Sequence, residues 1–141
     1  MEQLLEFASN HPILSLAFVA ILGLLIWTFI AGAAQGVSKL SPGDATRLIN
    51  HEDAVVLDVR VDGEYHRGHI LNAIHIPEKT LPEQVNKLDK FRDRPIIATC
   101  RTGHRSAGAC QTLRKNGFQK VYTLNGGILA WENANLPLTK K

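Results

Sequence analysis

A run of 22 uncharged residues, 13–34, constrains this chain of 141 residues more than any other feature. Its only hydroxyl-bearing side chains are those of Ser15 and Thr28. At about 1.5 Å of rise per residue, such a helix is about 33 Å long and matches the roughly 30 Å hydrocarbon core of a bilayer. A helix in the core of a soluble protein would show a polar face at helical spacing, and this run has none. The sequence therefore predicts one transmembrane helix over residues 13–34.

A cleaved signal peptide is the competing interpretation, because residues 31–33 (Ala-Gly-Ala) resemble a cleavage site. However, the segment before the run holds only the acidic charges of Glu2 and Glu6, and the run exceeds the usual apolar length of about 7–15 residues. An uncleaved anchor is favoured. All 16 Lys and Arg residues follow the helix. The positive-inside bias therefore predicts that residues 1–12 form a short extracytoplasmic segment and that everything after the helix is cytoplasmic.

The remainder of the chain predicts a short linker at residues 35–40 and a single domain at residues 41–138. Within the domain, short apolar runs typical of strands alternate along the chain with segments whose apolar residues recur at helical spacing. The expected strands are residues 54–59, 73–77, 94–99 and 120–124. One helix is expected to start at Ser41, and three more are expected at residues 81–91, 106–116 and 126–133. Such alternation is typical of an α/β fold with a mainly parallel central sheet flanked by helices.

Charge and cysteine content exclude several classes of function. Of the 13 acidic residues, 11 follow the helix, so the domain has a modest basic excess without a basic run or an aromatic-interleaved patch. This pattern predicts no nucleic-acid partner and fits a surface that faces anionic lipid or small anionic substrates. The two cysteines form no CxxC motif, and the six histidines show no paired-ligand spacing with them. We therefore expect neither a disulfide framework nor a metal site.

The segment that carries chemistry is residues 100–106 (Cys-Arg-Thr-Gly-His-Arg-Ser), directly after a predicted strand. Ligands of open α/β sheets bind beyond the carboxyl ends of the strands. Backbone N–H groups of such a loop, together with the start of the next helix, favour a thiolate at Cys100. Arg101 and Arg105 add permanent positive charge that would also hold an anionic donor. Cys110 has no adjacent cation and is predicted to be a core cysteine rather than a resolving thiol.

Several ordered motifs resemble the single-domain rhodaneses, the thiosulfate sulfurtransferase family. They are the loop at 100–106, the segment LDVR at 57–60, the block at 64–77 and the closing motif LNGGILAW at 124–131. The resemblance covers about residues 39–138, which is nearly all of the chain after the helix. Together with the N-terminal anchor, the chain resembles the membrane-anchored rhodaneses of the bacterial inner membrane.

This resemblance implies a rhodanese-like fold in which a cysteine accepts a sulfane sulfur as a persulfide and passes it to a thiol acceptor. By position, Cys100 is the nucleophile, and the residues expected to bind the donor are Arg101, Thr102, Gly103, His104 and Arg105. Supporting roles fall to Asp58, Arg60 and Ser106, the first two by bracing the loop, whereas His69 and Trp131 are expected to be structural. The implied partners are a small sulfur donor, either thiosulfate or a persulfide, and a thiol. Neither a cofactor nor a metal is implied.

Two alternatives compete with sulfur transfer. Cysteine phosphatases and arsenate reductases use a similar loop with five residues between the cysteine and the arginine, whereas four residues separate Cys100 from Arg105 here. The smaller ring favours a single terminal sulfur over a phosphate. The second alternative is a membrane-tethered interaction module that binds another membrane protein with little or no catalysis. The intact loop favours sulfur transfer, while the physiological donor, the acceptor and the oligomeric state stay open.

Overall fold

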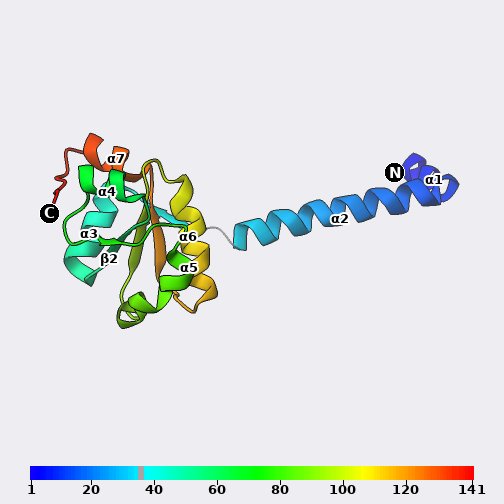
Figure 1. Cartoon of the computed structure of the whole chain (residues 1–141). Coiled ribbons are helices and arrows are strands. Elements are labelled where there is room, and N and C mark those ends of the chain that lie inside the picture. Colours follow the sequence, from blue (N-terminus) through cyan, green and yellow to red (C-terminus); the bar gives the residue numbers. More distant parts are fainter. Residues whose placement is uncertain (35–36) are drawn as a thin grey trace. The chain divides into compact units, whose positions relative to one another are not determined.

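The computed structural model describes residues 1–34 and 37–141, with the side chains of residues 32–34 left out. The chain divides into two compact units, Met1–Gly36 and Val37–Lys141. Figure 1 shows both units.

The N-terminal unit contains two helices, α1 (Glu2–Asn10) and α2 (Pro12–Ala34). Within α2, the segment Pro12–Ala31 has a mean hydropathy of 2.6, and no residue in its most apolar stretch is buried. Large side chains such as Trp27 and Phe29 are 72% and 80% exposed. By length and composition α2 can therefore cross a bilayer, in agreement with the helix predicted at residues 13–34. Helix α1 was not predicted, since residues 1–12 were expected only as a short segment.

The second unit is built on a parallel sheet of five strands in the order β1-β5-β4-β2-β3. The strands are β1 (Ser38–Leu40), β2 (Val55–Asp58), β3 (Ile74–His75), β4 (Ile96–Thr99) and β5 (Val121–Leu124). The predicted α/β class with a mainly parallel sheet is confirmed. The four expected strands are all present, and each is shorter than its apolar run because the ends lead into turns.

The linker predicted at residues 35–40 is wrong at its C-terminal end, since Ser38–Leu40 pair with β5 as the edge strand β1. Residues 35 and 36 lie outside the described part of the chain. Strand β1 was not predicted, because it has only three residues, and the two exposed ones, Ser38 and Lys39, show no alternation of polar and apolar side chains. The compact unit that contains the sheet begins at Val37.

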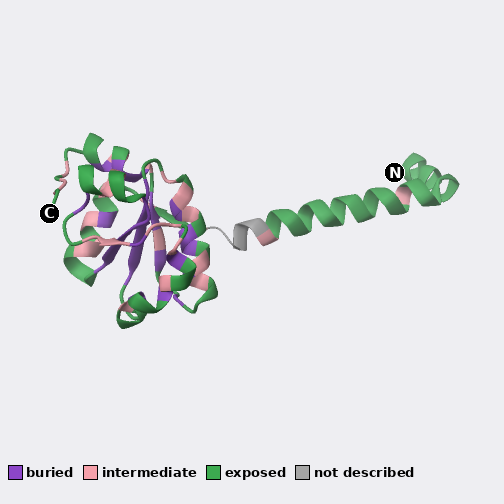
Figure 2. Cartoon of the chain, viewed as in Figure 1, coloured by how far each residue is buried: buried purple, intermediate pink, exposed green. Residues whose placement is uncertain are grey.

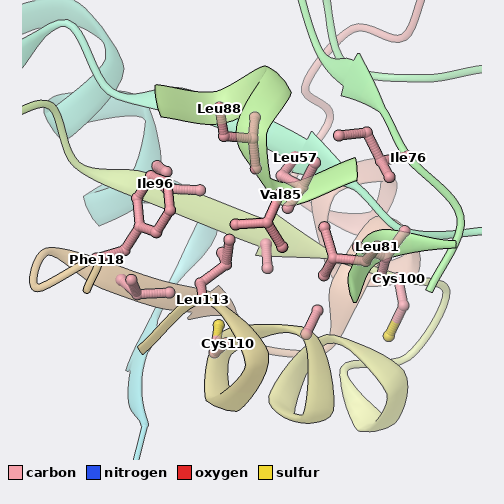
Figure 3. Close-up of a cluster of buried hydrophobic side chains, with 14 residues drawn as sticks. Leu57, Ile76, Leu81, Val85, Leu88, Ile96, Cys100, Cys110, Leu113 and Phe118 are labelled. Carbon is pink, nitrogen blue, oxygen red and sulfur yellow. The ribbon is translucent and has the colours of Figure 1, made fainter. Parts of the chain in front are cut away.

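Helices cover both faces of the sheet, and the buried strands lie between them (Figure 2). One face packs against α5 (Leu81–Gln84), the 3₁₀ helix η1 (Val85–Phe91) and α6 (His104–Lys115). The other face packs against α3 (Pro42–Glu52) and α7 (Gly127–Asn133). Alternation along β2 divides the two cores, because Leu57 points into the first and Val56 into the second. The first core is shown in Figure 3.

Three helices differ from the sequence-based expectation. The helix predicted at 81–91 splits into α5 and η1, because Val85, Leu88 and Phe91 recur every third residue and share one side of a 3₁₀ helix. Helix α6 begins at His104, two residues before the predicted start. The short helix α4 (Asp62–Arg67) was missed, because its residues are polar and none is buried. The expected start of α3 is confirmed, with Ser41 Oγ accepting a hydrogen bond from the Asp44 N–H at 3.1 Å.

Candidate active site

Cys100 directly follows β4 and is 1% exposed. Its Sγ accepts a hydrogen bond from the backbone N–H of Gly103 at 3.0 Å. Gly103 is the N-cap residue of α6, so the sulfur lies at the positive end of a 12-residue helix. The thiol can donate to Ser106 Oγ at 3.7 Å, and that hydroxyl donates to the Gly103 carbonyl at 3.1 Å. Figure 3 shows the Cys100 side chain at the edge of the core, beyond Leu81.

The start of α7 holds the loop that follows Cys100. The N–H of Ile128 donates to the Cys100 carbonyl at 2.9 Å, and the N–H of Leu129 donates to the Arg101 carbonyl at 3.2 Å. Gly127 makes this close approach possible, because a Cβ there would collide with the Cys100 carbonyl and lie 2.6 Å from the Arg101 carbonyl carbon. With φ at +61°, the position also strongly favours glycine. The carbonyls of the loop are thus tied to α7, and the N–H of Gly103 is left for the sulfur.

The side chains of Asp58 and Arg60 form a buried ion pair at the end of β2. Arg60 Nε donates to Asp58 Oδ1 at 2.9 Å, and Nη2 donates to Oδ2 at 2.6 Å. Nη2 also donates to the Gly68 carbonyl at 2.7 Å. The support for the loop is therefore indirect, because these side-chain bonds tie β2 to Gly68. A backbone bond from the Val59 N–H to the Thr99 carbonyl at 3.0 Å connects this corner to the strand that carries Cys100.

The two loop arginines have different surroundings. Arg105 Nη2 donates to both carboxylate oxygens of Glu64, at 3.2 and 3.1 Å, so much of its charge is compensated. Arg101 is exposed, and its guanidinium group makes no hydrogen bond or ion pair within residues 1–34 and 37–141. Sequence reasoning missed Glu64, although it opens one of the quoted motifs, because the pair spans 41 residues of sequence. Of the two arginines, Arg101 therefore retains the charge that can attract an anion.

Four of the five predicted binding residues, all except Arg105, line two separate hollows. Arg101 borders a cleft of about 210 Å³, whose other walls come from the end of α4, from α7 and from Leu138. Thr102, Gly103 and His104 border a second hollow of about 250 Å³, beside Lys39 and the end of β5. The side chains of Thr102 and His104 are exposed. The loop thus lies between two hollows, one bordered by Arg101 and the other by Thr102, Gly103 and His104.

Cys110 lies on α6 inside the first core, next to Leu113 and far along the helix from the loop (Figure 3). Its thiol is fully buried and donates to the Tyr122 carbonyl at 3.3 Å. Burial raises the pKa of Cys110 to about 12, so the thiol is protonated at neutral pH. A protonated thiol is a poor nucleophile, in agreement with the predicted core role.

His69 and Trp131 are both buried and bonded to the C-terminal segment. The two ring nitrogens of His69 face the carbonyls of Tyr65 and Lys141, at 3.0 and 2.7 Å. Trp131 Nε1 donates to the Pro137 carbonyl at 3.0 Å. The ring of Tyr65 stacks on that of His69 at 3.8 Å, and burial raises the pKa of the tyrosine. Both His69 nitrogens are engaged with backbone oxygens, so the ring is held as a structural element.

Three comparisons place this geometry among known proteins. The family model described as "Rhodanese-like domain" matches residues 41–134. The chain is 36% identical over 141 residues to the uncharacterised protein YibN of Escherichia coli K12, covering 99% of either chain. It is 35% identical to the thiosulfate sulfurtransferase GlpE of Coxiella burnetii, over 67% of this chain and 86% of that protein. The crystal structure of a rhodanese-related protein from Thermoplasma volcanium has a TM-score of 0.67 at 31% identity, covering 74% of this chain and 99% of that one.

Proposed function

Because this chain belongs to the rhodanese-like domain family, we propose that it is a membrane-anchored sulfurtransferase that carries a sulfane sulfur on Cys100. The family and the relatives named as sulfurtransferases support sulfur transfer as its general activity. The observation that carries the finer proposal is the 3.0 Å hydrogen bond from the Gly103 N–H to Cys100 Sγ at the start of α6. A donor N–H and a helix N-terminus both stabilise negative charge, so they favour the thiolate and a persulfide anion.

Sulfur transfer proceeds in two displacements at this sulfur. The Cys100 thiolate attacks the sulfane sulfur of the donor, the new S–S bond forms, and the donor's S–S bond breaks. With thiosulfate the bonding electron pair leaves on sulfite, and with a persulfide donor it leaves on the donor thiolate. An acceptor thiolate then attacks the terminal sulfur, and Cys100 leaves as the thiolate. The two steps together involve no net oxidation or reduction, and the reaction requires neither a metal nor a cofactor.

The surrounding residues supply positioning and charge. Arg101 attracts an anionic donor, while Arg105 is largely compensated by Glu64. The loop backbone at Thr102, Gly103 and His104 surrounds the terminal sulfur, and Ser106 holds the loop through its bond to Gly103. The four-residue interval between Cys100 and Arg105 supports a small sulfur ligand over a phosphate. Asp58 and Arg60 hold the neighbouring corner of the sheet.

The test is to find the sulfur on the protein. After incubation of the full chain in detergent with thiosulfate, we expect a mass increase of about 32 Da on the peptide containing Cys100. The peptide containing Cys110 should be unmodified, because the pKa of that thiol is about 12. A matched Cys110→Ala variant should gain the same mass at Cys100. An adduct on Cys110, or no adduct at all, would contradict the proposal.

Helix α2 anchors this activity in the bacterial inner membrane, with residues 1–12 outside and the domain in the cytoplasm. The apolar surface of α2 and the absence of Lys and Arg before it support this arrangement. We expect the full chain to stay in the membrane pellet after an alkaline carbonate wash, and a variant lacking residues 13–34 to be released. In spheroplasts, externally added protease should leave the domain intact. Cleavage of the domain by that protease would reverse the proposed orientation.

A further inference from the structure

Helix α1 has one apolar face and one polar face. At about 3.6 residues per turn, its apolar side chains fall within one half of the helix circumference and its polar side chains within the other half. The apolar face carries Leu4, Leu5, Phe7 and Ala8. The polar face carries Glu2, Gln3, Glu6, Ser9 and Asn10. A helix divided in this way is expected to bury its apolar face against a partner.

Helix α2 does not provide that partner, although it follows α1 directly. None of the residues of α1 is buried. On the apolar face, Leu4 is 73% exposed, Leu5 is 72% exposed and Phe7 is 53% exposed. The apolar face of α1 is therefore free to contact something outside its own helix pair.

The chain bends between α1 and α2. The N–H of His11 caps α1 by donating to the Phe7 carbonyl at 2.9 Å, and His11 itself is not helical, with φ at −131° and ψ at 63°. Pro12 begins α2, and a proline disfavours helical geometry at the residue before it. Figure 1 shows that α1 and α2 run in different directions. Helix α1 is therefore not a straight extension of α2.

The length of α2 places α1 at the boundary between lipid and water. With 23 residues, α2 is about 35 Å long and already exceeds a hydrocarbon core of roughly 30 Å. Helix α1 has 9 residues and is about 14 Å long, which is too short to cross that core. Because only His11 separates the two helices, α1 stays close to the end of α2. The surface that α1 meets there is that of the bilayer itself.

We propose that α1 lies flat on the extracytoplasmic surface of the bilayer, with its apolar face among the upper acyl chains and its polar face in water. The inference rests on the proposed membrane anchor and adds a second contact with the lipid. The lipid surface that fits is zwitterionic, because the charged side chains of α1 are Glu2 and Glu6, and no Lys or Arg precedes α2. Binding then comes from the burial of apolar side chains rather than from attraction to anionic headgroups.

The experiment compares how deeply the two faces of α1 lie in the membrane. The full chain, with Cys100→Ser and Cys110→Ala to remove the other thiols, receives one new cysteine that carries an environment-sensitive fluorophore. The sites are Ala8→Cys on the apolar face and Asn10→Cys on the polar face, in nanodiscs of phosphatidylcholine. Iodide quenches labels in water, and doxyl-labelled lipid quenches labels among acyl chains. Asn10 is nearer to α2 in sequence, so a gradient of depth along the chain alone would shield Asn10 more than Ala8.

We expect the opposite order, with iodide quenching about threefold weaker at Ala8 than at Asn10 and lipid quenching stronger at Ala8. Replacing Leu4, Leu5 and Phe7 together with Gln should remove this difference, because α1 then has no large apolar side chain to bury. Adding phosphatidylglycerol to the nanodiscs should not increase the shielding at Ala8, since α1 has no basic side chain. An increase would contradict the zwitterionic surface.

A label at Gly23→Cys, in the middle of α2, is the control for the anchor, because a Cβ at Gly23 meets no atom within 4 Å. If iodide quenched this label as strongly as the label at Asn10, the membrane anchor of the proposed function would be wrong. With Gly23 shielded, equal iodide quenching at Ala8 and Asn10 would overturn the inference about α1. Shielding of Ala8 from both quenchers would also overturn it, because a second copy of the chain would then cover the apolar face instead of lipid.

Discussion

Replacing Cys100 with serine is expected to lower the rate of sulfur transfer from thiosulfate by at least about 10³-fold. A serine hydroxyl is not ionised at neutral pH and forms no persulfide, so both displacements lose their nucleophile. The oxygen can still accept the hydrogen bond that Sγ now accepts from the Gly103 N–H at 3.0 Å, so the loop should keep its conformation. The measurement is formation of thiocyanate from thiosulfate and cyanide by the full chain in detergent.

The matched control is Cys110→Ala. This residue is a second buried cysteine, but it lies in the core, where its thiol donates to the Tyr122 carbonyl. Removing its sulfur leaves a small cavity, so the free energy of unfolding should fall by about 1 kcal/mol while the rate stays within about twofold of wild type. A Cys100→Ser protein that kept more than a tenth of the wild-type rate would contradict the assignment of Cys100 as nucleophile. It would favour the alternative of an interaction module whose chemistry is vestigial.

The position of Cys100 is the part of the site that the sequence predicts best. A predicted strand that ends at Thr99, a glycine within the next few residues and a helix thereafter are local features. Together they place the thiol at a strand end and a helix start, as found. The parallel sheet follows from the alternation of strands and helices for the same reason, because each element is specified by its own residues.

The remaining features of the site depend on contacts between distant segments, which no local pattern specifies. The compensation of Arg105 by Glu64 joins the helices α4 and α6. The bonds from Ile128 and Leu129 to the loop carbonyls come from α7. The motif at 124–131 was recognised through a resemblance, but the reason for its second glycine, Gly127, appears only when the loop backbone lies against it. The cleft beside Arg101 likewise exists only in the folded domain, because separate segments of the sequence form its walls.

The ion pair of Asp58 and Arg60 is expected to contribute far more to stability than an exposed pair does. Asp58 is 0% exposed and Arg60 is 5% exposed, so replacing Arg60 with methionine leaves a buried carboxylate without its partner and the Gly68 carbonyl without a donor. Loss of one partner of a buried pair costs about 3–5 kcal/mol, and we expect a decrease of this size in the free energy of unfolding. Chemical denaturation of the full chain in detergent, followed by circular dichroism, provides the measurement.

Two further variants show whether the cost comes from the orphaned charge. Arg47→Met removes one side of an exposed pair, Arg47 with Asp44, whose side chains are 75% and 56% exposed. It should change the free energy of unfolding by less than about 1 kcal/mol. The double variant Asp58→Asn with Arg60→Met should recover part of the loss, because it removes the unpaired charge together with its partner. If Arg60→Met cost no more than Arg47→Met, the corner beside the Cys100 loop would be held by the backbone bond between Val59 and Thr99 rather than by the ion pair.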